Sequence, residues 1–168
     1  MKKLNTNSLA VTGLLVALHI ILSRFCSINA LNIKIGFAFV PVFAAAYLYG
    51  PLMAGIVGGL GDFLGAILFP IGPYFPGFTL TCVLTGLVFG LLLHKSQTPL
   101  RIAGAVAINQ LVLGLVVNTY WISTLYGSAF FPLMGTRVVQ CLILIPVEFL
   151  VISFMTRALF ARHKEVFA

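Results

Sequence analysis

Residues 52–93 consist of two apolar runs, LMAGIVGGLGDFLGAILF at 52–69 and FTLTCVLTGLVFGLLL at 78–93, separated by PIGPYFPG at 70–77. Each run approaches the length of about 20 residues that an α-helix needs to cross the hydrocarbon core of a bilayer. The intervening segment cannot continue either helix, because proline lacks a backbone donor and its ring blocks the preceding turn. The pattern therefore predicts two membrane helices joined by a stiff, non-helical loop.

The composition of the whole chain agrees with this prediction. Of its 168 residues, 61% are apolar and 8% are charged, and the mean hydropathy is +1.13. A water-soluble globule is excluded, since an ordinary soluble domain is about 25% charged. The length allows roughly six spans and leaves nothing for a second domain. We expect residues 1–168 to form a single all-α integral membrane domain with six transmembrane helices.

The remaining spans follow from apolar runs bounded by glycine, proline and charge. They are predicted at Leu9–Ser23, Phe37–Tyr49, Ile102–Leu125 and Phe131–Phe160. A polar stretch at 27–34 is long enough to be a loop between the first two helices. The segment 9–22 after Lys2 and Lys3 imitates a secretory signal, but no small-residue cleavage site follows it, so it should stay attached as the first span.

The basic residues set the orientation, because cytoplasmic loops carry an excess of lysine and arginine. With a cytoplasmic N-terminus, seven of the ten fall inside: Lys2, Lys3, Lys95, Arg101, Arg157, Arg162 and Lys164. Arg24, Lys34 and Arg137 fall on the outer side. Both termini are therefore predicted inside, and loops 27–34, 70–77 and 125–131 outside. The net charge of +7 is assigned to topology and to contacts with anionic lipid, and nucleic-acid binding is not expected.

Catalysis and metal binding are not expected. The only acidic residues are Asp62, Glu148 and Glu165, which is too few for a carboxylate-rich site. Cys26, Cys82 and Cys141 lack the spacing of a metal site or of a disulfide framework and are interpreted as small apolar fillers. No G-x-x-x-x-G-K-[ST] phosphate loop is present, and no nucleophile stands with a paired base. We predict that the protein is not an enzyme and does not itself hydrolyse ATP.

The 70–77 loop has the features of a lid. Pro70, Gly72, Pro73 and Pro76 fix its backbone, while Tyr74, Phe75 and the following Phe78 present flat faces suited to a planar ligand. The alternative is a rigid turn whose aromatic side chains belong to an interfacial belt. This segment alone leaves both interpretations open.

Two further pairs of residues stand at helical i, i+3 spacing near the outer side. Asn118 and Trp121 could hydrogen-bond and stack an aromatic heterocycle, although a lone tryptophan at this depth is also typical of a membrane anchor. Arg137 and Gln140 should face inward, and an arginine within the membrane needs an anionic partner. That partner is either Asp62 or Glu148, or else an anionic substrate.

Other polar and small residues within the spans have structural explanations. Asp62 lies in the glycine-rich segment 58–65, where a structural pair or network is favoured over direct ligand contact. His19 is expected to be a packed core histidine, and Glu148 a partner or cavity residue. Ala10, Gly13 and Ala17 form a small-residue face on the first helix that permits close packing of another helix, inside this protein or in a partner subunit.

Taken together, these stretches resemble the folate-specific substrate-binding subunits, or S components, of energy-coupling factor (ECF) vitamin transporters, the FolT family. The similar stretches are LSRF at 22–25, IGFAFVP at 35–41, Gly50-Pro51, GDFLG at 61–65, PIGPYFPGFTL at 70–80, NTYWIS at 118–123 and Tyr126-Gly127. The proline-rich aromatic segment is the most specific of them.

The resemblance implies an uptake mechanism without any cofactor. A monomeric S component in the bacterial cell membrane captures the vitamin outside, then joins a transmembrane coupling subunit and two cytoplasmic ATPases. It is thought to topple in the bilayer to release its cargo inside. The resemblance also assigns partner docking to the small face of Ala10, Gly13 and Ala17, and Gly13 stands where the family often has alanine.

Folate agrees with the residues singled out above. Its flat pterin would lie against Trp121, Phe75 and Tyr74, in the segment that includes Gly77 and Phe78. Edge hydrogen bonds would come from Asn118, Gln140 or Asp62. The carboxylates would meet Arg24, Lys34 or Arg137 nearer the mouth, and loops 27–36 and 70–77 would form the outer gate. The alternatives are an S component for riboflavin or thiamine, and a membrane protein that imports nothing, such as a lipid-binding subunit or a small membrane enzyme.

Overall fold

The computed structural model describes residues 6–30, 33–127 and 130–166, without the side chains of 28–30, 33–35 and 159–166. The elements in chain order are α1 (Thr6–Arg24), β1 (Ser27–Ala30), β2 (Ile33–Gly36), α2 (Phe39–Tyr49), α3 (Pro51–Leu68), α4 (Pro76–Leu93), α5 (Pro99–Ala107), the π-helix η1 (Ile108–Val117), α6 (Asn118–Tyr126) and α7 (Phe130–Val166). Lys2 and Lys3, and Ser128 in the predicted outer loop at 125–131, lie outside the described residues.

Within the described ranges, the helices form the six predicted membrane segments. Segments α5, η1 and α6 follow one another without a break and make one helix from Pro99 to Tyr126. Five of the six are long and apolar enough to cross a membrane, and α2 is a shorter apolar helix. Every helix begins within three residues of its predicted start. The prediction of an all-helical membrane protein is confirmed for these segments.

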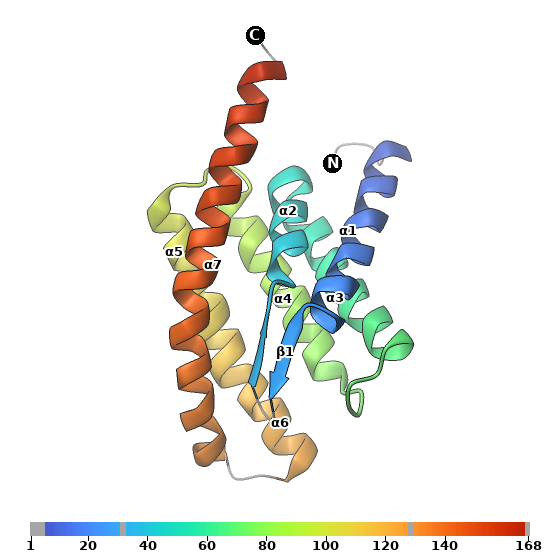
Figure 1. Cartoon of the computed structure of the whole chain (residues 1–168), viewed down its shortest axis with the longest axis vertical. Coiled ribbons are helices and arrows are strands. Elements are labelled where there is room, and N and C mark those ends of the chain that lie inside the picture. The colour runs from blue at the N-terminus through green and yellow to red at the C-terminus, as the bar shows by residue number, and fades with distance from the viewer. Residues whose placement is uncertain (1–5, 31–32, 128–129, 167–168) are drawn as a thin grey trace.

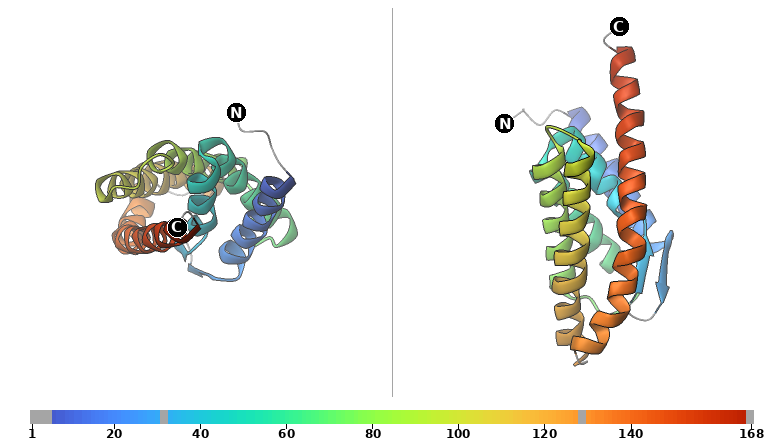
Figure 2. Two further views of the ribbon diagram at one scale, coloured as in Figure 1. Left: turned by 90° about the horizontal axis from the view of Figure 1, so that it is seen from above. Right: turned by 90° about the vertical axis from the view of Figure 1, so that its left-hand side faces the viewer.

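The connection after α1, predicted at 27–34 as a loop between the first two helices, contains a β-hairpin. Strands β1 and β2 pair antiparallel, with Ser27 opposite Gly36 and Ala30 opposite Ile33. β1 contacts α1, and β2 contacts α7. Seen along the bundle, the hairpin bridges the space between these two helices (Figure 2). Pairing satisfies backbone groups that a loop close to the apolar region would leave without partners.

The two ends of the helix bundle carry different connecting segments. α1 begins and α7 ends at one end, where the α4–α5 connection also lies (Figure 1). The hairpin, the 69–75 loop and the turn between α6 and α7 lie at the opposite end. The loops predicted to be external are therefore gathered at the same end of the molecule.

Glycines let α3 and α4 pack backbone against backbone. A methyl group at Gly58 would lie 2.5 Å from the carbonyl oxygen of Cys82, and one at Gly86 would collide with the backbone of Ala54. Small residues at such crossings allow the close packing typical of membrane helices. The turn into α3 also needs glycine, because Gly50 has a φ of 89°.

Apolar side chains fill the end of the bundle at which α1 begins. Its fully buried members include Val42 and Phe43 on α2, Val57 on α3, Phe89 and Leu93 on α4, and Ile152 on α7. The rings of Phe43 and Phe89 meet edge to face at 6.3 Å. This solid half holds the helices in register and leaves the opposite half free to enclose a ligand.

Candidate ligand-binding site

A cavity of about 810 Å³ occupies the half of the bundle near the hairpin and the 69–75 loop. All six membrane segments contribute to its lining, the fifth through η1 and α6. The volume lies within the range of about 300–1,000 Å³ typical of small-molecule sites. Such a cavity can enclose most of a vitamin-sized ligand.

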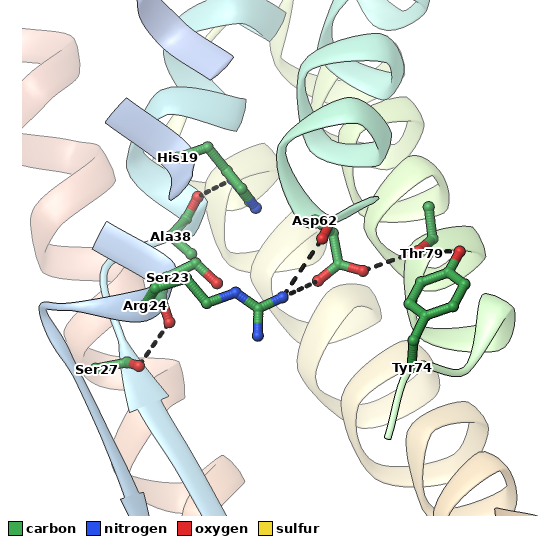
Figure 3. A network of polar contacts seen from close by, with 8 residues as sticks. All are labelled: His19, Ser23, Arg24, Ser27, Ala38, Asp62, Tyr74 and Thr79. Carbon is green, nitrogen blue, oxygen red and sulfur yellow. Dashed lines mark hydrogen bonds and ion pairs between the residues drawn. The ribbon is translucent and has the colours of Figure 1, made fainter. Parts of the chain in front are cut away.

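Near the mouth, a polar network connects the 69–75 loop with α1 (Figure 3). Arg24 Nη2 lies 3.7 Å from Asp62 Oδ1. Thr79 Oγ1 donates to Asp62 Oδ2 at 2.9 Å and lies 3.2 Å from the Tyr74 hydroxyl oxygen. Because the Thr79 proton is directed to the carboxylate, Tyr74 is the donor to Thr79. Asp62 thus has the structural network that its sequence context favoured, and it also lines the cavity.

Glycines on α3 make room for the α1 side chains of this region. A methyl group at Gly65 would lie 3.0 Å from Arg24 Nε, and one at Gly61 would lie 2.5 Å from the ring of His19. His19 is buried, and its Nδ1 donates to the Ala38 carbonyl at 3.0 Å. The expected packing of His19 is confirmed, although its ring also borders the cavity.

The 69–75 loop and the start of α4 form one wall of the mouth. The predicted loop residues Gly72, Pro73, Tyr74 and Phe75 line the cavity, as does Phe78 on α4. Pro76 and Gly77 belong to the first turn of α4, where proline is well tolerated. They and Pro70 are not among the lining residues.

Trp121 lies behind this wall and is not one of the lining residues. Its ring is 5.5 Å from that of Phe75, centroid to centroid, and its indole N–H donates to Thr81 Oγ1 at 3.2 Å. A methyl group at Gly77 would lie 2.5 Å from the indole. Trp121 and Gly77 therefore fit each other between α6 and α4, and Trp121 supports Phe75 from outside the cavity.

Asn118, Arg137 and Gln140 all border the cavity. Arg137 is buried, and its Nη1 donates to the carbonyl oxygen of Gly114 at 2.9 Å. In the described part of the chain it has no ion pair with Asp62 or Glu148, and its Nε has no hydrogen-bond partner. Asn118 Oδ1 is likewise buried without a partner among the described residues. Lys34 belongs to β2, but its side chain lies outside the described part.

The inner end of the cavity holds Asn109 and Gln110, which sequence reasoning did not assign to the site, together with Glu148, which it expected as a partner or cavity residue. Asn109, Gln110 and Glu148 line it and are at most 9% exposed. Gln110 Nε2 donates to Glu148 Oε1 at 2.6 Å. The signal that could have found them is the adjacent Asn109 and Gln110 within an apolar membrane run, since polar side chains there are costly.

The π-helix places the amides of the fifth membrane segment on one wall. Asn109 and Asn118 are nine residues apart, which in an α-helix is two and a half turns and would direct them to opposite sides. In η1 each hydrogen bond spans five residues instead of four, so more residues fit in each turn. Both asparagines consequently face the cavity.

The small-residue face predicted on the first helix lies apart from the cavity. On the outer surface of α1, the side chains of Ala10 and Ala17 are exposed, and no atom lies within 4 Å of a methyl group placed at Gly13. Among the described residues no group of three histidines, cysteines or acids is placed to hold a metal ion.

Comparisons with known proteins place this chain in a family. Residues 3–157 match the family described as "ECF-type riboflavin transporter, S component". The chain therefore belongs to the S components of ECF-type transporters, which are membrane transporter subunits and not enzymes.

The relatives within this family include folate transporters. The folate transporter FolT of Clostridium novyi (strain NT) is 38% identical over 153 residues, which cover 90% of this chain and 88% of the relative. FolT of Leuconostoc mesenteroides is 29% identical over 153 residues, covering 87% and 82%. A crystal structure of FolT bound with folic acid superimposes with a TM-score of 0.86 at 30% identity, covering 90% of this chain and 93% of that one.

Proposed function

We propose that this chain is the folate-binding S component of an ECF transporter, which captures extracellular folate for ATP-driven uptake by its partner subunits. The observation that carries the proposal is the cavity of about 810 Å³, which combines aromatic rings, buried amides and two arginines. Folate combines a flat heterocycle, an aromatic linker and carboxylates, and each of these meets a matching group. The similarity to FolT bound with folic acid supports the same ligand.

In the proposed complex, Tyr74 and Phe75 cover the aromatic part of the ligand, and Trp121 holds Phe75 in place. Asn118 and Gln140 supply hydrogen bonds to polar edges, and Phe78 contributes apolar contact. The glutamate carboxylates meet Arg24 and Arg137, since guanidinium groups form strong charge-assisted bonds with carboxylates. Lys34 adds positive charge at the rim. Loops 27–36 and 70–77 act as the gate.

The membrane arrangement follows from charge and from the two ends of the bundle. Residues 1–168 form one membrane domain in the bacterial cell membrane, with both termini in the cytoplasm and the gate outside. Lys95 and Arg101 lie in and just after the α4–α5 connection, at the cytoplasmic end, as the positive-inside rule requires. The isolated subunit is a monomer.

For uptake, it joins a transmembrane coupling subunit and two cytoplasmic ATPases. It docks on its partner through the small face formed by Ala10, Gly13 and Ala17.

Calorimetric titration of the purified protein with folate, riboflavin and thiamine tests this function. We expect tight binding of folate alone. Arg24→Ala and Arg137→Ala should each weaken folate binding about 10- to 100-fold, the value of a lost charge-assisted hydrogen bond. Pteroic acid, which lacks the glutamate, should lose much less affinity in the same variants.

Arg101→Ala is the matched control, because Arg101 is an exposed arginine at the opposite end of the bundle. Its folate affinity should equal that of the wild type. Binding of riboflavin or thiamine in preference to folate would overturn the assignment of the ligand. Equal losses for folate and pteroic acid would overturn the roles of the two arginines.

A further inference from the structure

The inner end of the cavity contains a carboxyl group with one oxygen that lacks a hydrogen-bond partner among the described residues. Glu148 on α7 is 5% exposed, and its Oε1 accepts a 2.6 Å hydrogen bond from Gln110 Nε2. Its Oε2 is buried and has no partner in the described part of the chain. A buried acid in this state is costly unless a further donor reaches it.

Asn109 on η1 places a second side chain without hydrogen-bond partners among the described residues in the same region. It is 6% exposed and lines the cavity. Neither its Oδ1 nor its Nδ2 has a hydrogen-bond partner among the described residues. Buried amides are almost always bonded, so a side chain with both atoms free in a cavity wall is best explained by a ligand.

No cation in the described part of the chain is placed to satisfy Glu148. Among the described residues that line the cavity, the arginines are Arg24 and Arg137. Arg24 is paired with Asp62, and Arg137 donates to Gly114. Arg137 precedes Glu148 by eleven residues on α7, which is about 16 Å along the helix axis. The missing donors must therefore come from what fills the cavity.

We propose that Glu148 and Asn109 form the subsite that recognises the aminopyrimidine edge of the folate pterin ring, with Gln110 positioning the Glu148 carboxyl. This inference rests on the proposed function and specifies which end of the ligand is read by which residues. The pterin edge offers a ring N–H and an exocyclic amino group side by side. A carboxylate accepts two such parallel bonds, as it does from a guanidinium.

The remaining atoms of the edge match Asn109. Its amide nitrogen can donate to the ring carbonyl or to a ring nitrogen, and its oxygen can accept from the amino group. Arg137 and Glu148 then bind opposite ends of the ligand. The carboxylates lie near Arg137 at the mouth, and the pterin lies near Glu148 at the inner end. Tyr74 and Phe75 at the mouth cover the middle of the molecule.

The subsite also accounts for discrimination between vitamins within this family. The corresponding edge of an isoalloxazine ring has one N–H between two carbonyl oxygens and no amino group. A carboxylate facing those oxygens would be repelled, because both groups are hydrogen-bond acceptors. Glu148 therefore both attracts the pterin edge and opposes the flavin edge, which is how specificity is commonly built.

The test compares folate with its 2-oxo analogue, in which the ring amino group is replaced by oxygen. Both ligands are titrated into the purified full-length protein. The wild type should prefer folate by at least about tenfold, the value of one charge-assisted hydrogen bond. Glu148→Gln should lose most of that preference, because an amide can donate to the new carbonyl oxygen.

The Asn109→Leu variant distinguishes a role of Asn109 in ligand recognition from a role in the stability of the protein. Since neither polar atom of Asn109 bonds to a described residue, the variant should keep or exceed the melting temperature of the empty protein. Its folate affinity should nevertheless fall about tenfold. Gln97→Leu is the matched control, because Gln97 lies outside the cavity and donates to the Leu93 carbonyl at 2.6 Å. It should bind folate as the wild type does.

Three outcomes overturn the inference. They are an unchanged preference between the two ligands in Glu148→Gln, an unchanged folate affinity in Asn109→Leu, and a fall in melting temperature in Asn109→Leu that accounts for its loss of binding. Each of these leaves the proposed function intact as long as the wild type binds folate. Failure of the wild type to bind folate would instead overturn the proposed function and, with it, this subsite.

Discussion

Asp62 shows what a single residue discloses before the fold is known. A lone carboxylate among glycines in a membrane helix must be bonded, and its sequence context favoured a network. The identity of the partners was not predictable, since Arg24 and Thr79 come from two other helices. Trp121 shows the opposite case, because its i, i+3 spacing from Asn118 suggested ligand contact, whereas its ring packs outside the cavity wall.

The Thr79 hydroxyl should control how long the ligand remains bound. It connects Tyr74 of the 69–75 loop, the proposed gate, to Asp62, so Thr79→Val removes both bonds while preserving the shape of the side chain. We expect folate to dissociate several-fold faster, because one net hydrogen bond contributes about 1 kcal/mol. Stopped-flow displacement of bound folate measures this rate.

Tyr74→Phe should give the same acceleration, and the double variant no more than either single one, since the two hydroxyls act in series. Thr124→Val serves as the control, because Thr124 is exposed and, among the described residues, its hydroxyl donates to the Tyr120 carbonyl of its own helix. A dissociation rate that stays unchanged in Thr79→Val would show that the network does not hold the gate.

At the scale of elements, hydropathy predicted the helices but not their internal register. The apolar run at 102–125 predicted one helix, and Pro99–Tyr126 forms one. The π-segment Ile108–Val117 within it is not encoded in the apolar pattern, which does not distinguish a hydrogen bond to the fourth residue from one to the fifth. Hydropathy also does not reveal the hairpin at 27–36, where the sequence predicts a loop at 27–34, because strand pairing depends on contact with neighbouring helices.

The close contact of α3 and α4 should make Gly86 intolerant of a side chain. A methyl group there would collide with the Ala54 backbone, and backbone cannot give way as a flexible side chain would. Gly86→Ala should destabilise the protein by about 1–3 kcal/mol, as overpacking does. A lower midpoint in thermal unfolding of the purified protein checks this.

Gly104→Ala provides the comparison, because no atom lies within 4 Å of a methyl group at that position. It should leave stability unchanged or raise it by up to about 1 kcal/mol through helix propensity. Equal midpoints for the two alanine variants would contradict the assigned contact.

At the scale of the whole molecule, the bundle separates a solid half from a hollow one. The core side chains of α2, α4 and α7 fill one half, and the cavity occupies the other, next to the 69–75 loop. The exposed small face of α1 is independent of the cavity. If the small face is the docking surface, as proposed, ligand binding and partner docking should be separable by mutation.

Ala17→Trp tests this separation. A large ring on the small face should prevent close approach of the coupling subunit while leaving the cavity intact. Folate affinity of the isolated protein should equal that of the wild type, whereas ATP-driven folate uptake into proteoliposomes containing all subunits should fall to background. Ala103→Trp on α5 is the control, since Ala103 is also exposed. Normal uptake by Ala17→Trp would place docking elsewhere.

By itself, the sequence determined that this is a membrane protein with six helical spans, a stiff aromatic loop and arginines on the side of that loop. These properties are local, because the cost of placing a residue in the membrane depends on its own side chain and close neighbours. Only the tertiary structure decided which polar groups share a cavity. Arg24 meets Asp62, and Gln110 meets Glu148, across different helices. Such pairings depend on helix packing and on the π-helical register of η1, both of which arise from contacts between segments distant in sequence.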